Sequence, residues 1–180
     1  MEKLGFNKDT VASLKRSLLS NANLGLRIQI QGNYAFVYAP IFLEDISTPA
    51  TYLFNWGKAE DNGTISQYLQ AKAEQNGSIF HTFTYSLKPK RWYYVGVQEW
   101  TQTTFDWEIW STLGQQDRPR SKILQHLEDH SGNNVLKREE IVELLNSRVL
   151  KQICFNLSGD AHVDSSREMC VAMGYTPPAS

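Results

Sequence analysis

The chain reads SIFHTFTYSLKPKRWYYVGVQEW from Ser78 to Trp100. Two runs of aromatic and β-branched residues flank the short basic link Lys88-Pro89-Lys90-Arg91. Residues of these types favour strands, since they pack well on a pleated, half-buried surface, and a short link with proline is typical of a hairpin. The stretch therefore predicts two long antiparallel strands at the centre of the fold. Trp92 and Trp100 are an even number of residues apart, so we expect both on the same face of their strand, in the core.

The length and composition favour one globular domain. The chain has 180 residues, of which 41% are hydrophobic and 21% charged, with an excess of aromatic residues at 12%. A chain of this length can bury a sizeable core without disulfides or metals, and the composition excludes general disorder. We expect a single domain over residues 1–180, with a frayed tail at 176–180.

Charge and cysteine content narrow the range of partners. The net charge of -1 removes the simplest argument for a nucleic-acid binder, although a local cluster of Lys and Arg is enough to contact phosphates. Cys154 and Cys170 have no partners at zinc-ligand spacing, so we expect reduced thiols and neither a metal nor a cofactor. The sequence shows no signal peptide and no apolar run long enough to span a membrane, which predicts an intracellular protein, nuclear or cytoplasmic.

Helical and alternating patterns follow one another along the chain without a regular repeat. Helices are predicted at about 10–18, 65–76, 121–130 and 137–147, with Thr64 and Gln67 as a capping box for the second. Strands are predicted at 26–31 and 34–39, joined by Gly32-Asn33, and at 105–110, 149–157 and 168–175. Residues 43–58 break both patterns, and we expect an irregular segment there. This order excludes a doubly wound parallel sheet and predicts an α+β protein with a mainly antiparallel, strongly curved sheet or small barrel flanked by helices.

Trp56 is the first candidate binding residue. It lies between Asn55 and Gly57, where glycine permits close backbone approach, and an indole face can stack on a nucleobase for roughly 1–3 kcal/mol. The alternative is that Trp56 fills one end of the barrel. Trp107 and Trp110 would point to opposite faces of a strand, so one can lie in the core while the other forms a second wall of an aromatic pocket.

Two groups of basic residues are candidates for phosphate contacts. Lys88, Lys90 and Arg91 form the densest cluster, on the hairpin link beside aromatic residues. The alternative is a solvated hairpin tip that prevents edge-to-edge association. Arg118 and Arg120 lie just ahead of a predicted helix, where free backbone N–H groups also attract anions.

Catalytic patterns are weaker. Asp106 and Glu108 share one face of a predicted strand and could bind a metal, but no lysine follows at the spacing of common nucleases, and solvated carboxylates are the alternative. The four histidines have no spacing that suggests a zinc site. We therefore assign no catalytic residue and no metal ligand.

The order of features from Tyr34 to Trp100 resembles the PUA-like superfamily of small β-barrels, which includes the YTH, EVE and ASCH domains. The features that carry this resemblance are Tyr34-Ala35-Phe36-Val37-Tyr38, Asp45-Ile46, Asn55-Trp56 ahead of Asp61-Asn62-Gly63, a helix, Gly77-Ser78-Ile79-Phe80 and Tyr94-Val95-Gly96-Val97. The C-terminal half departs from YTH domains and is closer to uncharacterised PUA-like domains of fungal proteins. The resemblance implies a PUA-like barrel in which Trp56 forms one wall of a cage around a methylated adenine.

Taken together, these features predict a non-catalytic module that binds DNA or RNA and reads a modified or flipped base. In this hypothesis Trp56 stacks on the base and Asn55 or Asp61 hydrogen-bonds its edge, with Trp107 or Trp110 as a second wall. The phosphates are held by Lys88, Lys90, Arg91, Arg118 and Arg120. One alternative is a metal-dependent nuclease or hydrolase that uses Asp106 and Glu108. Another is a protein-interaction module with exposed aromatic residues.

Overall fold

The computed structural model describes residues 27–44, 51–86, 89–105, 107–114, 117–131 and 136–175. Its strands are β1 (Ile28–Gln31), β2 (Tyr34–Tyr38), β3 (Ile41–Glu44), β4 (Thr51–Lys58), β5 (Ile79–Ser86), β6 (Arg91–Gln102) and β7 (Leu150–Ser158). Its helices are α2 (Ala59–Asn76), α3 (Ile109–Thr112), α4 (Arg118–His130), α5 (Arg138–Asn146), α6 (Val163–Ala172) and a 3-10 turn at Asp160–His162. The fold is therefore α+β, as predicted.

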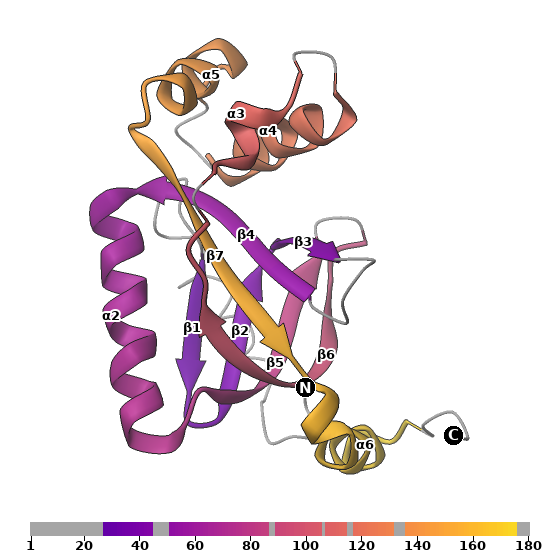
Figure 1. Ribbon diagram of the computed structural model, residues 1–180. Helices are drawn as coiled ribbons and strands as arrows, with labels where there is room; N and C mark the ends of the chain where they lie inside the picture. The colour runs from indigo at the N-terminus through magenta and orange to yellow at the C-terminus, as the bar shows by residue number, and fades with distance from the viewer. Residues whose placement is uncertain are drawn as a thin grey trace.

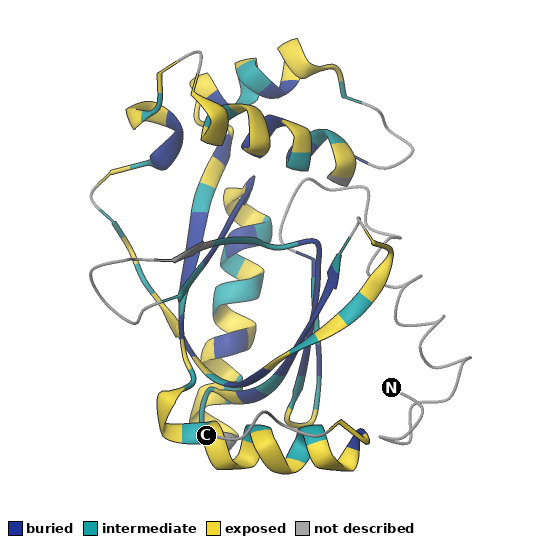
Figure 2. Cartoon of the chain, turned by 90° about the vertical axis from the view of Figure 1, so that its right-hand side faces the viewer, coloured by how far each residue is buried: buried dark blue, intermediate teal, exposed yellow. Residues whose placement is uncertain are grey.

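The seven strands form one sheet in the order β1-β2-β5-β6-β7-β4-β3. Only the β2–β5 pair is parallel, and every other pair is antiparallel. The sheet curves strongly (Figure 2), but within the described residues it stays open, with β1 and β3 as its edges. The helices α3, α4 and α5 lie together at one end of the sheet, and α6 lies at the opposite end (Figure 1). Strand β7 runs from the first end to the second.

The central hairpin of β5 and β6 forms as predicted, but it contains a bulge. Thr82 pairs with Gly96 and Phe83 pairs with Tyr94, so Val95 is an extra residue on β6. Gly96 has φ 116°, which glycine adopts without steric cost. An extra residue reverses the side-chain alternation of everything that follows it.

This bulge places Trp92 and Trp100 on opposite faces of the sheet, so the prediction that they share a face is wrong. Trp92 packs edge-on against Tyr85, with ring centroids 5.3 Å apart. Trp100 lies on the other face, where its Nε1 donates a hydrogen bond to Thr82 Oγ1 at 3.0 Å. Both residues still serve the core, on different sides.

Three clusters of buried side chains follow from this arrangement. The α2-side core lies on one face of the sheet and includes Val37, Leu53, Trp100, Phe155 and Leu69 of α2. The α6-side core lies on the other face and includes Phe36, Tyr38, Phe83, Tyr85 and Met173. The end core joins β4 and β7 to α3, α4 and α5 and includes Phe54, Trp56, Trp110, Leu127 and Leu145.

Several predicted elements differ from the structure. The segment at 43–58, expected to be irregular, contains β4, because its continuous apolar run is buried on both faces of the sheet. The strands expected at 105–110 and 168–175 are absent from the described residues: Ile109 and Trp110 begin α3, and residues 168–172 belong to α6. Met169 of α6 and Met173, the residue after α6, both pack in the α6-side core. Over so short an apolar run, helical spacing and strand alternation cannot be told apart from the sequence.

Helix α2 is longer at its start than predicted. It begins at Ala59, and Thr64 lies inside it, where the hydroxyl donates to the Glu60 carbonyl at 3.0 Å instead of capping the helix. The prediction that Gly77 ends the helix is confirmed, with φ 73° and its N–H bonded to Ala73 O. The predicted helix at 10–18 and the tail at 176–180 lie outside the described residues.

Candidate nucleic-acid interface

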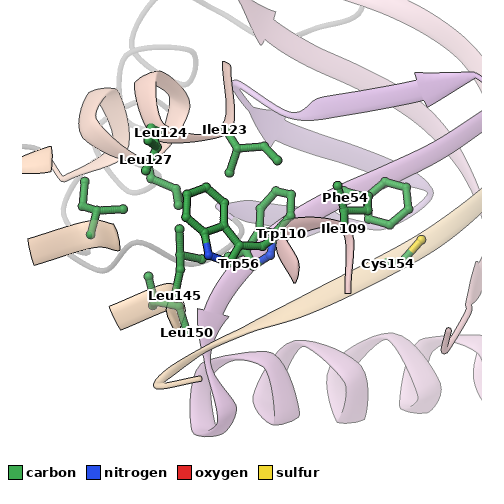
Figure 3. Close-up of a cluster of buried hydrophobic side chains, with 11 residues drawn as sticks. Phe54, Trp56, Ile109, Trp110, Ile123, Leu124, Leu127, Leu145, Leu150 and Cys154 are labelled. Atoms are coloured by element: carbon green, nitrogen blue, oxygen red, sulfur yellow. The ribbon is translucent and has the colours of Figure 1, made fainter. Parts of the chain in front are cut away.

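Asn55 and Trp56, the predicted base-binding pair, are buried in β4. The Trp56 side chain is 1% exposed and lies in the end core beside Phe54 and Trp110 (Figure 3). Asn55 is fully buried, and its Oδ1 accepts a hydrogen bond from the Trp56 backbone N–H at 2.7 Å. A base cannot reach the Trp56 ring in this structure. The alternative is that Trp56 fills one end of a barrel, and the structure buries it in the end core of a sheet that is open within the described residues.

Trp110 of α3 and Arg120 of α4 are in contact, and Trp107 lies two residues before the start of α3. Trp110 is 3% exposed, whereas Trp107 is 48% exposed. The guanidinium carbon of Arg120 lies 3.8 Å from the centroid of the Trp110 ring. The Trp110 Nε1 donates to Asn146 Oδ1 of α5 at 2.9 Å. Trp110 thus links three helices, and Trp107 presents a tryptophan face to solvent beside it.

Two adjoining hollows lie at this place. The inner hollow, of about 250 Å³, is lined by Trp110, Ser111, Arg120, Leu145, Asn146 and Arg148. The outer hollow, of about 390 Å³, is lined by Phe105, Trp107, Glu108, Ser111, Thr112 and Arg148. Because Ser111 and Arg148 line both, the two hollows are neighbours. Together their linings contain two cationic residues, Arg120 and Arg148, and one acidic residue, Glu108.

Arg148 was not identified from the sequence. It follows α5 in a left-handed conformation with φ 59°, and its N–H bonds to the Leu145 carbonyl at 3.2 Å. This conformation at a helix end is usual for glycine and costs a side chain such as arginine roughly 1–2 kcal/mol. The one feature of the sequence that marks Arg148 is the absence of a glycine after the helix predicted at 137–147. That feature does not predict a hollow beside Arg148.

The other predicted site residues lie away from the two hollows. Arg118 is exposed on the first turn of α4, and Asp61 is half-buried on the first turn of α2. Lys90, in the turn before β6, and Arg91, the first residue of β6, are both exposed, and Arg91 Nε donates to the Tyr93 hydroxyl at 2.7 Å. Lys88 lies outside the described residues. Of the five predicted phosphate-binding cations, the structure places Arg120 in the lining.

A second polar cluster ties α6 to the sheet. His81 Nδ1 and the Tyr94 hydroxyl are 2.9 Å apart, and Tyr94 also hydrogen-bonds Ser166. Ser166 Oγ accepts the Val97 N–H at 2.8 Å and donates to the His162 carbonyl at 2.9 Å. Burial lowers the pKa of His81, and burial raises the pKa of Tyr94 to about 12. Both groups are therefore neutral at neutral pH, and the chain of hydrogen bonds holds α6 in place.

The described residues offer little for covalent or metal chemistry. Burial raises the pKa of the Cys154 thiol to about 12, so it is a poor nucleophile at neutral pH. No three His, Cys, Asp or Glu side chains gather closely enough within the described ranges to hold a metal ion. Asp106, the partner expected for Glu108, lies outside these ranges. The helices of the described chain include none that is long and apolar enough to cross a membrane.

Comparisons with family models, with curated proteins and with solved structures found no match to this chain. The resemblance to PUA-like domains accordingly stays a prediction. The geometry of the two hollows is the basis on which a function can be assigned.

Proposed function

We propose that the protein is a non-catalytic module that binds single-stranded DNA or RNA in the two hollows, with a base stacked on Trp107. The observation that carries this proposal is the position of Trp107, which is 48% exposed and lines the outer hollow together with Arg148, while Arg120 lines the neighbouring inner hollow. Stacking on an aromatic side chain contributes roughly 1–3 kcal/mol per base, and nearby arginines attract the backbone. Base reading thus moves from Trp56 to Trp107.

Packing from the core outward supports this role for Trp107. Phe105 stacks on Phe54 with ring centroids 5.9 Å apart, and Trp107 packs on Phe105 with centroids 5.1 Å apart. The three rings thus run from the buried Phe54 through Phe105 to the exposed Trp107, so the Trp107 ring is supported on one side. A side chain that is already held loses less conformational entropy when a ligand binds.

Glu108 supplies a group that can read a base edge. Glu108 lines the outer hollow together with Trp107, and carboxylates accept hydrogen bonds from the exocyclic amines of bases. A modified or flipped base falls within the same proposal. The curved, mainly antiparallel sheet flanked by helices is compatible with the resemblance to PUA-like domains, but within the described residues it is open, not a closed barrel.

Fluorescence anisotropy with labelled single- and double-stranded DNA and RNA, with and without base methylation, tests the proposal. We expect the single-stranded probes to bind, and Trp107→Ala to weaken their binding about tenfold or more, as the loss of one stacked base implies. Tyr175→Ala is the matched control, because Tyr175 is 68% exposed and lies beyond α6 at the opposite end of the sheet. Absence of binding to every probe, or equal binding by Trp107→Ala and the wild type, would overturn the proposal.

The same probes test the nuclease alternative when Mg²⁺ or Mn²⁺ is added. Cleavage that is lost in both Asp106→Ala and Glu108→Ala would replace the non-catalytic proposal with a metal-dependent one.

A further inference from the structure

We infer that the inner hollow is a phosphate subsite, which holds a phosphate group next to the base that stacks on Trp107. This inference rests on the proposed function for its biological ligand. It goes beyond that function by assigning a distinct chemistry to each hollow and a distinct role to Arg120.

The lining of the inner hollow favours an anion with several acceptor oxygens. Its polar lining residues are Arg120, Arg148, Ser111 and Asn146, and the Asn146 Oδ1 already accepts a hydrogen bond from Trp110 Nε1. Among the described residues, none with an acidic side chain lines it, whereas Glu108 lines the outer hollow. Guanidinium groups bind phosphate oxygens through paired N–H donors, so two of them facing one hollow form a suitable cradle.

Arg120 is held in place before any ligand arrives. One face of its guanidinium lies on the Trp110 ring at 3.8 Å, and its Nη1 donates to the Leu113 carbonyl at 3.0 Å. The ring beneath it is fixed in turn by the hydrogen bond from Trp110 Nε1 to Asn146. No carboxylate of the described chain forms an ion pair with Arg120. Its remaining N–H groups are therefore oriented and available to a phosphate.

Arg148 connects the two hollows. It lines both of them, and its backbone has the unfavourable φ of 59°. Backbone strain of this kind persists where the surrounding structure enforces it, and it concentrates at ligand sites. A cation between the two hollows would contact the phosphate that follows or precedes the stacked base. The arrangement fits one nucleotide unit, with its base in the outer hollow and its phosphate in the inner one.

The deciding experiment compares two arginines of the same helix turn. Arg120 lines the inner hollow, whereas Arg118 is exposed and lies outside the lining. We expect Arg120→Gln to raise the Kd for a single-stranded oligonucleotide about tenfold and to reduce the slope of log K against log salt by about one. Arg118→Gln should change the Kd by about twofold or less. Arg148→Gln gives a second test on an exposed residue, should Arg120→Gln fail to fold.

Three phosphate sources separate the possible ligands. Inorganic phosphate, a 5′-phosphorylated oligonucleotide and its unphosphorylated counterpart are titrated while the indole N–H resonance of Trp110 is followed by NMR. Inorganic phosphate should shift this resonance in the wild type but not in Arg120→Gln. A preference for the 5′-phosphorylated probe assigns the subsite to a strand end, and equal binding assigns it to an internal phosphodiester.

The failures of the two proposals can be told apart. The phosphate subsite is overturned, and the proposed function stays intact, if oligonucleotide binding needs Trp107 but is equally strong in Arg120→Gln and Arg118→Gln. If Arg120→Gln does not fold, Arg148→Gln takes its place in this comparison. A phosphate-induced shift that needs Arg120, without binding of any oligonucleotide, would support the subsite and overturn the proposed function.

Discussion

Trp56→Ala is the substitution that separates a core tryptophan from a ligand-binding one. Trp56 is 1% exposed and lies in the end core beside Phe54 and Trp110. A buried aromatic side chain of this size removes roughly 150–250 Å² from water, and truncation of Trp to Ala in a core costs about 3–5 kcal/mol. The Trp56 Nε1 is buried without a hydrogen-bond partner in the described structure. Because truncation also removes this unsatisfied donor, we expect the free energy of unfolding to fall by about 3 kcal/mol, the lower end of that range.

Urea denaturation followed by far-UV circular dichroism measures this loss. Trp107→Ala is the control, because a residue that is 48% exposed should cost about 1 kcal/mol or less. The two variants should therefore behave in opposite ways, with Trp56→Ala affecting stability and Trp107→Ala affecting oligonucleotide binding. A Trp56→Ala protein that is as stable as the wild type but has lost binding would refute this reasoning and return the base-binding role to Trp56.

Three further measurements test other parts of the structure. Thr82→Val removes the oxygen that accepts the buried Trp100 Nε1–H, and urea denaturation should show a loss of about 1–3 kcal/mol, with a smaller loss for Thr82→Ser, which keeps the acceptor. Gly96→Ala places a Cβ 3.2 Å from Ser166 Oγ at φ 116°, and calorimetry should show a Tm lower by several degrees, corresponding to about 1–3 kcal/mol; an unchanged Tm would contradict the bulge geometry. The His126 Nε2 is fully buried, and burial lowers the pKa of His126 to about 4, below the value of about 6.5 in an unfolded chain. The unfolded state then binds a proton that the native state excludes, so stability present above about pH 6.5 is lost as the pH falls toward 4, by roughly 2 kcal/mol near pH 5. His126→Gln should flatten this part of the profile, and an equal fall in both proteins would show that another group is responsible.

The sequence predicted the elements whose patterns are local. The hairpin of β5 and β6, the hairpin at Gly32-Asn33 and the helices α4 and α5 all lie close to their predicted positions. In each of them, alternation or helical spacing agrees with the turn or cap at the end of the element. Where two periods fit the same short run, as in α3 and α6, the sequence could not decide between them.

The register of the central hairpin shows where local patterns stop being sufficient. The bulge at Val95 depends on the pairing between β5 and β6, and it reverses the face on which Trp100 lies. Glycine at position 96 permits this geometry but does not require it. A pattern read along one strand assumes that no residue is inserted, so it assigned Trp92 and Trp100 to one face.

The sequence by itself determined the α+β class, the mainly antiparallel pairing and which positions carry tryptophan and arginine. Only the tertiary structure decided which tryptophan is buried and which is exposed, because burial depends on the elements that pack over a side chain. The helices α3, α4 and α5 close over Trp56 and leave Trp107 in solvent. The same packing places Arg120 and Arg148 in the lining of one hollow although they are separated in the chain. Local sequence records which residues are apolar or charged, whereas a site is made by the distances between elements that meet only after folding.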